Sequence, residues 1–220
     1  MWEALSERHD MKNQSIPSPV AWRLSLYLRQ LESLDEQGVE KISSRNLAES
    51  LQVTDAQVRK DLAYFGQFGR PGVGYRVAPL IEQIRHILGT DRIWKVIVVG
   101  AGDLGRALLR YRGFRQKGFE LVAAFDVSDA TVGSRIGRIV VRHVRELPGL
   151  IRRHEVKLAV VAVPPDAAQD VTDQLQRAGV KGILNFAPTT LQTDNGLVIR
   201  QVDLAAHLQQ LSFRVGTTPE

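Results

Sequence analysis

The sequence predicts an α/β protein in two parts, a small helical domain with a β-ribbon followed by a larger domain around a parallel sheet. Three observations predict it. Up to residue 89, apolar residues recur every three or four positions, which is the period of amphipathic helices. After residue 93, short apolar runs alternate with helical stretches, which is typical of a parallel sheet buried on both faces. A glycine-rich turn joins the first run to the next helix.

Length and composition exclude several classes of protein. A chain of 220 residues, 44% of them hydrophobic, can bury one large core or two small ones. The absence of cysteine excludes disulfides, thiolate metal sites and a thiol nucleophile. No apolar run approaches the roughly 18 residues that span a bilayer, and residues 1–15 lack the apolar centre of a signal peptide. We expect a cytoplasmic protein with a flexible tail over residues 1–15 and no membrane contact.

Three helices are predicted in the first domain, over residues 16–89. Apolar positions at helical spacing predict the first helix, and Gly38 ends it. A short second helix over residues 45–50 follows Ser43 and Ser44. Thr54 with Gln57 three residues later forms a capping-box pattern, which starts a third helix over about residues 55–65. The apolar positions of the first helix are Val20, Leu24, Tyr27, Leu28, Leu31 and Leu34.

A glycine-rich segment follows the third helix and predicts a two-stranded ribbon. Its turn lies between Phe68 and Tyr75 and contains Pro71 with four nearby glycines. The order of three helices and a ribbon is that of a winged helix-turn-helix. An amphipathic segment over residues 79–88 then leads into the second domain. The glycines are Gly66, Gly69, Gly72 and Gly74.

Local charge, more than total charge, points to DNA. The chain has 29 Lys plus Arg and 24 Asp plus Glu, a net charge of +5, but residues 16–89 account for only +1. Residues 56–76 concentrate four basic side chains against one acid, on the third helix and the ribbon. The alternatives are a solvated helix face and, for the two serines, a helix cap. The predicted DNA contacts are Ser43, Ser44, Gln57, Arg59, Lys60, Tyr64, Arg70 and Gly72.

The second domain, over residues 90–202, is predicted to be a doubly wound Rossmann-like sheet. Its apolar runs cover residues 94–99, 121–125, 139–141, 158–163, 183–184 and 197–202. Helical stretches lie near residues 104–117, 144–154, 166–178 and 203–211, the last belonging to a C-terminal segment over 203–220.

The turn after the first strand predicts a dinucleotide site. In a GxGxxG turn, the glycines allow a tight turn, the approach of a pyrophosphate and close helix packing. Asp126 ends the next strand, where a carboxylate accepts ribose hydroxyls and repels a 2′-phosphate, which favours NAD(H) over NADP(H). The alternatives are a coenzyme A site or an ordinary turn with a surface aspartate. The turn itself consists of Gly100, Ala101, Gly102, Asp103, Leu104 and Gly105.

No convincing catalytic group accompanies this site. Tyr111 is followed four residues later by Arg115, whose guanidinium cannot act as a base. His143 and His154 have basic neighbours and read as solvated, and the spacing of Asp203 and His207 makes only a weak proton relay. We therefore expect a cofactor that is sensed, with no catalytic residue, no metal and no enzymatic turnover. The alternative is an NAD-dependent oxidoreductase or a CoA-binding enzyme with an accessory winged-helix domain.

From about residue 16 to residue 213 the chain resembles the Rex-type redox-sensing transcriptional repressors of bacteria. The resemblance rests on seven separated motifs in the same order. It implies a homodimer that binds palindromic operator DNA in the NAD+ or apo form and is released by NADH. The motifs are VEKISSRNLA at 39–48, QVRKDLAYFGQFGRPGVG at 57–74, VVGAGDLG at 98–105, YRGF at 111–114, AAFDV at 123–127, VPPDAAQ at 163–169 and GILNFAP at 182–188.

The resemblance also implies roles for single residues. Tyr111 resembles a tyrosine near the nicotinamide, Asp203 an aspartate that pairs differently in the two redox forms, and Arg29 its alternative partner. The last helix is implied to swap between subunits, although it could instead pack on its own sheet. Asp103, where a neutral Asn is common, and the lack of a further aromatic residue beyond Phe213 depart from the family pattern. The implied lining of the nicotinamide pocket is Pro164, Asn185, Phe186 and Pro188.

Overall fold

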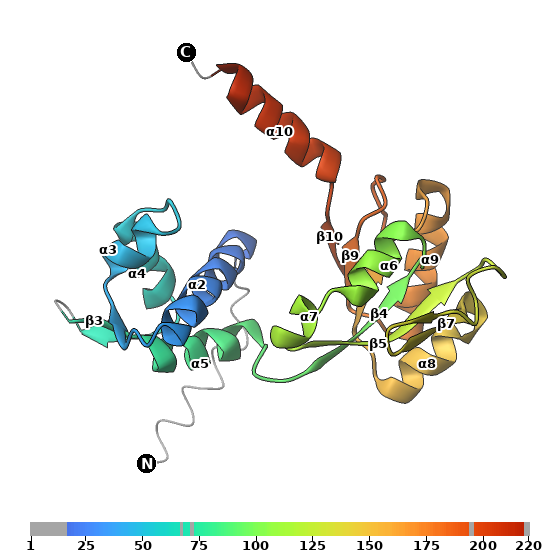
Figure 1. The fold of residues 1–220 in the computed structure, drawn as a ribbon, viewed down its shortest axis with the longest axis horizontal. Coiled ribbons are helices and arrows are strands. Elements are labelled where there is room, and N and C mark those ends of the chain that lie inside the picture. Colours follow the sequence, from blue (N-terminus) through green and yellow to red (C-terminus); the bar gives the residue numbers. More distant parts are fainter. Residues whose placement is uncertain (1–16, 67, 71–72, 194–195, 218–220) are drawn as a thin grey trace. The chain divides into compact units, whose positions relative to one another are not determined.

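The computed structural model describes residues 17–66, 68–70, 73–193 and 196–217 (Figure 1). The predicted tail over residues 1–15 lies outside this range. The chain divides into two compact units, Met1–Arg92 and Ile93–Glu220, which we name the helical unit and the sheet unit.

The helical unit forms the three helices and the ribbon of a winged helix-turn-helix. Its first helix buries Leu24, Tyr27, Leu28 and Leu31 and ends before Gly38, whose φ of +76° suits glycine. This face packs against the last helix of the unit around a shared apolar core. The elements are α2 (Ser18–Glu36), β1 (Lys41–Ile42), α3 (Ser44–Glu49), α4 (Asp55–Ala63), β2 (Gly69–Arg70), β3 (Gly74–Arg76) and α5 (Val77–Leu88).

The ribbon has three strands, in the order β1-β3-β2, so the prediction of two strands was incomplete. The missing strand is β1, which pairs antiparallel with β3 and sets Ile42 opposite Tyr75. Gly74 permits this approach, because a Cβ there would lie 2.6 Å from the carbonyl oxygen of Ile42. Two residues of strand are too short to produce a recognisable alternation in the sequence.

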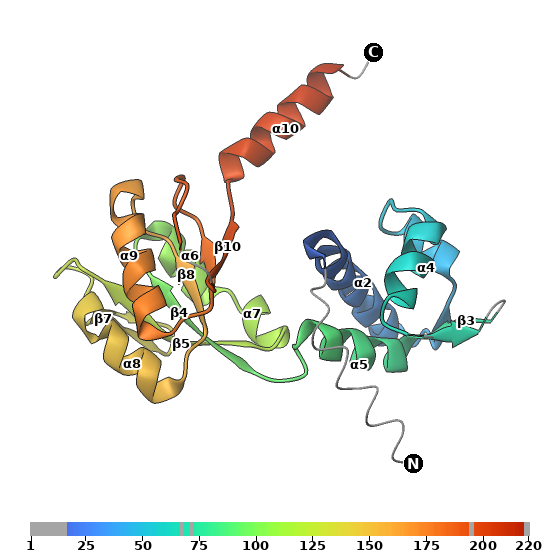
Figure 2. The ribbon, with the colours of Figure 1, turned by 180° about the vertical axis from the view of Figure 1, so that it is seen from behind.

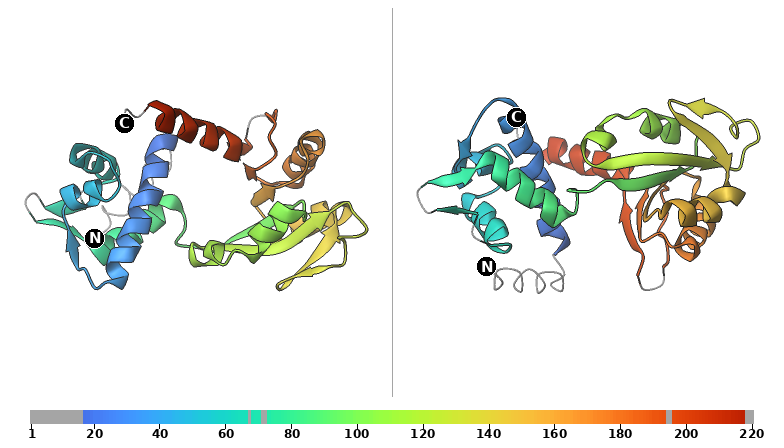
Figure 3. Two further views of the ribbon diagram at one scale, coloured as in Figure 1. Left: turned by 45° about the horizontal axis from the view of Figure 1, so that its top comes forward. Right: turned by 90° about the horizontal axis from the view of Figure 1, so that it is seen from below.

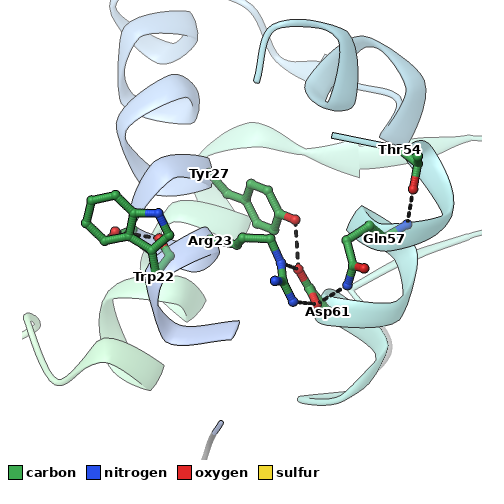
Figure 4. Close-up of polar contacts among 7 residues, drawn as sticks. Trp22, Arg23, Tyr27, Thr54, Gln57 and Asp61 are labelled. Atoms are coloured by element: carbon green, nitrogen blue, oxygen red, sulfur yellow. Dashed lines mark hydrogen bonds and ion pairs between the residues drawn. The ribbon is translucent and has the colours of Figure 1, made fainter. Parts of the chain in front are cut away.

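A buried carboxylate joins α2 to α4 (Figure 4). Asp61 is 2% exposed and lies on the face of α4 that also buries Val58 and Leu62. Arg23 on α2 donates to both carboxylate oxygens, from Nε at 2.5 Å and from Nη2 at 2.7 Å. The Tyr27 hydroxyl donates to the same group at 2.8 Å. Asp61 therefore has two partners on α2 within hydrogen-bond distance.

Gln57 completes this cluster from within α4. The Thr54 hydroxyl caps α4 by accepting the backbone N–H of Gln57 at 3.1 Å, as the capping-box pattern predicts. The side-chain amide, however, donates to Asp61 at 2.7 Å and is the last member of the four-residue group. Burial alone would raise the pKa of Asp61, but the hydrogen bonds from Arg23, Tyr27 and Gln57 outweigh burial and hold that pKa below its ordinary value.

The sheet unit has seven strands in the order β10-β9-β8-β4-β5-β7-β6. Six are parallel, and β6 pairs antiparallel with β7 at one edge. The chain crosses outward from β4 in both directions, as in a doubly wound Rossmann-type sheet. The strands are β4 (Trp94–Val99), β5 (Phe119–Asp126), β6 (Arg135–Ile136), β7 (Ile139–His143), β8 (Leu158–Val161), β9 (Gly182–Asn185) and β10 (Val198–Gln201).

Helices cover both faces of this sheet (Figures 1, 2 and 3). The predicted helix over residues 104–117 is two helices, because Tyr111 takes an extended backbone with ψ of 112° and ends the first. The Tyr111 ring then folds over Gly113, where a Cβ would meet the ring at 2.4 Å. The helices are α6 (Asp103–Arg110), α7 (Gly113–Gln116), the 3₁₀ turn η2 (Val144–Glu146), α8 (Leu147–His154), α9 (Pro165–Ala178) and α10 (Leu204–Thr217).

The C-terminal helix α10 extends away from the sheet of its own unit and has no buried residue (Figures 1 and 2). It runs to Thr217, beyond the predicted end at residue 211. Apolar side chains recur along it at helical spacing and are all more than half exposed: Leu204, Leu208, Leu211, Phe213 and Val215. Among the described residues, no helix has the length and apolar content needed to cross a membrane.

We expect Asp61→Ala to lower the free energy of unfolding of the helical unit by about 3–5 kcal/mol, because it strands the partly buried Arg23 and removes an acceptor from Tyr27. Denaturant unfolding followed by circular dichroism measures this loss. The matched control is Glu49→Ala, which breaks the exposed ion pair to Arg45 and should change stability little. Equal losses in the two variants would contradict the role given to Asp61.

Acid should remove the contribution of Asp61. Since the folded pKa lies below the unfolded value of about 3.9, the stabilisation is complete above that pH and disappears as pH falls through the folded pKa. The difference in unfolding free energy between wild type and Asp61→Asn should therefore be constant near neutrality and shrink below about pH 4. Unfolding curves at a series of pH values measure it. A difference that is independent of pH would show that the carboxylate charge plays no part.

Candidate functional site

Most of the predicted nucleotide-binding residues gather at one edge of the sheet. The carboxyl ends of parallel strands meet there, and β4 lies between β5 and β8, where the chain crosses outward in opposite directions. The glycine turn follows β4, Asp126 ends β5, Pro164 follows β8 and Asn185 ends β9. Open α/β sheets bind ligands at such a switch point.

Close packing requires two of the three glycines in the turn. Gly100 has a φ of +94°, and a Cβ there would lie 2.2 Å from the carbonyl oxygen of Ala162. A Cβ on Gly105 would lie 1.9 Å from the carbonyl oxygen of Gly100, so α6 could not begin so near the strand with any larger residue. Around Gly102 nothing lies within 4 Å of a Cβ. The turn is therefore tight on its inner side and open where a ligand would approach.

The first turn of α6 provides the groups that hold an anion. Gly102 is the residue before the helix, and the N–H groups that follow it lack acceptors within the helix. Together with the positive end of the helix dipole they favour a phosphate. The Asp103 side chain is exposed, so its carboxylate need not lie within the turn.

Asp126 is already engaged with the glycine turn. Its Oδ2 accepts the N–H of Ala101 at 2.8 Å, and its Oδ1 accepts the N–H of Ser128 at 2.9 Å. Each carboxylate oxygen can accept a second bond, so ribose hydroxyls can still be held here. The open side of Gly102, the helix end and this fixed carboxylate together fit the adenosine and pyrophosphate part of NAD(H).

The segment after β9 is shaped by a buried amide. Asn185 is fully buried, and its Oδ1 accepts the N–H of Ala187 at 3.0 Å. Its Nδ2 donates to Gln201 on β10 at 2.7 Å and to the carbonyl oxygen of Ala187 at 3.1 Å. These bonds turn the Asn185 side chain inward, so it organises the predicted pocket lining and does not itself face the open edge. Phe186 is partly buried against the core, whereas Pro164 and Pro188 are exposed.

The three residues of the predicted redox switch lie on different elements. Asp203 follows β10 and caps α10, because its Oδ1 accepts the N–H of Ala206 at 2.9 Å. Tyr111 is 61% exposed at the far end of α6, about 12 Å along the helix from the glycine turn. Arg29 is exposed on α2 in the helical unit. Their joint role stays a prediction.

The predicted DNA contacts lie on and around α4. α3 and α4 pack as a pair, and α4 turns Val58 and Leu62 toward the core while the Arg59 and Lys60 side chains are exposed. Arg59 donates to Asp55 at 2.6 Å and to the Ser44 hydroxyl at 3.2 Å. This ion pair holds the pKa of Asp55 below its ordinary value. Both contacts of Arg59 are exposed, and its part in DNA binding stays a prediction.

The remaining predicted contacts differ in how the structure engages them. Ser43 caps α3, its hydroxyl accepting the N–H of Asn46 at 3.0 Å, which is the alternative role the sequence left open. Gln57 is tied to Asp61, and Tyr64 is 46% exposed. The backbone of Arg70 lies in β2, but its side chain and the whole of Gly72 fall outside the described residues.

Two structural residues were missed by the sequence analysis. Asp61 holds α4 against α2, and the one available signal was an acid placed three residues after Val58 and next to Leu62, on the apolar face. Gln201 joins β10 to the segment after β9 by donating to the carbonyl oxygen of Ala187 at 2.7 Å. No local pattern marks Gln201, because its partners lie at least 14 residues away.

Two family models match the chain. "Putative DNA-binding protein N-terminus" covers residues 15–63, and "CoA binding domain" covers residues 91–189. The first match lies in the helical unit and the second spans the nucleotide edge of the sheet unit.

Relatives match both units together. The redox-sensing transcriptional repressor Rex of Carboxydothermus hydrogenoformans is 46% identical over 93% of this chain and 99% of its own. The Rex of Thermosipho africanus is 43% identical over 92% and 97%. Among solved structures, RSP, a Rex-family repressor, in complex with NAD+ and operator DNA is 36% identical, with a TM-score of 0.87 over 93% of this chain and 94% of that one. RSP in complex with NADH is 35% identical, with a TM-score of 0.85 over 93% and 96%.

Each of these matches covers more than nine-tenths of this chain and therefore includes most of both units. Identity above 40% over nine-tenths of the chain is far beyond what a shared sheet architecture alone produces. The chain belongs to the Rex family of redox-sensing transcriptional repressors.

Proposed function

We propose that this protein is a transcriptional repressor that senses the ratio of NADH to NAD+. It binds palindromic operator DNA as a homodimer in the NAD+ or apo form and leaves the DNA when NADH binds. One observation carries the proposal. The same chain contains an exposed basic helix pair and, in its other unit, a glycine turn and a carboxylate that fit NAD(H). Relatives named Rex and the RSP complexes with NAD+, NADH and operator DNA support it.

The proposed DNA contact uses α4 in the major groove. Arg59 and Lys60 are exposed there, and arginine suits a guanine edge while lysine suits a phosphate. Asp61 keeps these two side chains outward, because its bonds to α2 fix how α4 is rotated about its own axis.

The proposed sensor distinguishes two ligands that differ by one positive charge on the nicotinamide. A carboxylate near that ring responds to the difference, and Asp203, between the last strand and α10, is our candidate. NADH can shift the DNA-binding state only by its different affinity for two arrangements of the protein. Arg29 is its proposed alternative partner, and Tyr111 is the proposed tyrosine near the nicotinamide.

The proposed dimer uses α10. A helix of 14 residues with no buried side chain is too short to be stable alone. Its exposed stripe of leucines therefore calls for a partner surface. We propose that α10 swaps into a second copy of this chain.

The alternative of an oxidoreductase or CoA-binding enzyme is not favoured, since the full-length relatives are named repressors. We propose that the protein has no catalytic turnover. We also propose that it acts in the cytoplasm, because operator DNA and the NADH pool meet there.

We expect Arg59→Ala to weaken operator binding by about 1–3 kcal/mol and to reduce the preference for operator over random DNA, because Arg59 is the proposed base contact. Fluorescence anisotropy with both duplexes measures it. The control is Arg177→Ala, which removes the same charge from α9. An unchanged preference in Arg59→Ala would remove this residue from base recognition.

Asp126→Ala should lower the affinity for NADH and relax the discrimination against NADPH. The substitution removes the proposed ribose acceptor and frees the N–H groups of Ala101 and Ser128. Titrations followed by nicotinamide fluorescence compare the two ligands, with Asp129→Ala at an exposed neighbouring acid as control. Retained discrimination in Asp126→Ala would mean that another group recognises the ribose.

Two substitutions at Asp203 separate its charge from its role as a cap. Asp203→Asn keeps an oxygen for the N–H of Ala206 and loses the charge, whereas Asp203→Ala loses both. If the charge senses the nicotinamide, both variants should bind NADH yet no longer release operator DNA. A normal NADH response in Asp203→Asn would reject sensing by charge and leave only the cap.

A further inference from the structure

The net positive charge of this protein is concentrated in one stretch of the sheet unit. Residues 135–157 contain seven Lys plus Arg and two Asp plus Glu, a net charge of +5. The other 197 residues contain 22 of each sign, so this stretch carries the entire net charge of the chain. It includes none of the residues proposed to bind nucleotide or operator.

The fold gathers this stretch at one end of the sheet unit, where the β6–β7 hairpin leads through η2 into α8 (Figure 1). Val141 on β7 packs into the core on the face opposite α8, with Val96 and Val98. Its neighbours Val140 and Arg142 therefore point to the α8 face, because side chains alternate along a strand. Arg135 lies opposite Val140 in the hairpin and shares that face.

The helix adds its own basic residues. α8 buries Leu147 and Ile151 against the sheet, which leaves Arg152 and Arg153 exposed. We use the name basic face for the exposed arginines of the hairpin, η2 and α8 together. It consists of six exposed arginines: Arg135, Arg138, Arg142, Arg145, Arg152 and Arg153.

Most of this charge is not neutralised within the chain. Arg142 pairs with Glu146 at 2.9 Å. Among the described residues, the other five arginines of the basic face have no ion-pair partner. Like charges collected on one surface repel one another, so the basic face is suited to a polyanion.

We propose that the basic face binds the phosphates of duplex DNA independently of base sequence, as a second DNA contact on the sheet unit. The choice of DNA rests on the proposed function, since a repressor works beside this polyanion. Arginine matches phosphate with two parallel hydrogen bonds, and six of the seven cations are arginine. Residues 135–157 contain no Phe, Tyr or Trp, so the face lacks the stacking groups used for single strands and favours a duplex.

The test uses the full-length protein and a labelled duplex of random sequence, with affinity measured by anisotropy over a series of NaCl concentrations. The variant of the basic face is Arg138→Gln/Arg145→Gln/Arg152→Gln. The control is Arg177→Gln/Lys181→Gln/Arg200→Gln, which removes the same charge from exposed sites elsewhere on the sheet unit. Each phosphate contact contributes about 0.9 to the slope of log affinity against log salt concentration.

The basic-face variant should show a slope shallower than wild type by about 2–3, and the control by less than about 1. Equal slopes in the two variants would overturn the proposal. So would a basic-face variant that binds the duplex like the control but has lost binding to polyglutamate, which would indicate an acidic protein partner. Should the triple variant not fold, Arg152→Gln replaces it, with an expected change of about 0.9 against Arg200→Gln.

The same experiment keeps this proposal apart from the proposed function. The basic-face variant should retain the preference for operator over random duplex, whereas Arg59→Ala should reduce it. If the basic-face variant and the control have the same slope while operator preference is normal, only the proposal for the basic face is rejected. A wild-type protein with no operator preference and no response to NADH rejects the proposed function, whatever the slopes show.

Discussion

The arrangement of the helical unit depends on one buried carboxylate. Asp61 accepts four hydrogen bonds, from Arg23, Tyr27 and Gln57, and so fixes the rotation of α4 against α2. An apolar residue in its place could hold α4 in the core but would not specify its rotation so sharply, because apolar contacts have no direction. The proposed DNA contacts Arg59 and Lys60 lie on α4 and the proposed switch arginine Arg29 lies on α2, so Asp61 joins the two helices that carry them.

The sequence analysis predicted the helices of this unit well, because each has an apolar face at regular spacing. It missed what depends on distant partners. The strand β1 is two residues long and exists because Gly74 lets Ile42 approach β3. Asp61 was counted only as a charge, since its partners on α2 lie 34 and 38 residues earlier.

In the sheet unit, the parallel sheet and the glycine turn were predictable because strand burial and close glycine packing leave local marks in the sequence. The break in the helix at Tyr111 and the antiparallel strand β6 were not, since both depend on short segments with weak patterns. The sequence indicated which residues lie near the site but not the direction in which their side chains point. Asn185 was assigned to the pocket lining, but its amide points inward because Ala187 and Gln201 satisfy it.

This inward amide has a consequence for how the site discriminates its ligands. Five hydrogen bonds through Asn185 and Gln201 hold residues 186–189 in shape before any ligand arrives. Such preorganisation lowers the entropy lost on binding. It also means that the segment meets both oxidation states of a dinucleotide with the same shape. At this segment, selectivity between them must then arise from electrostatics, because the two forms differ by one positive charge on the nicotinamide.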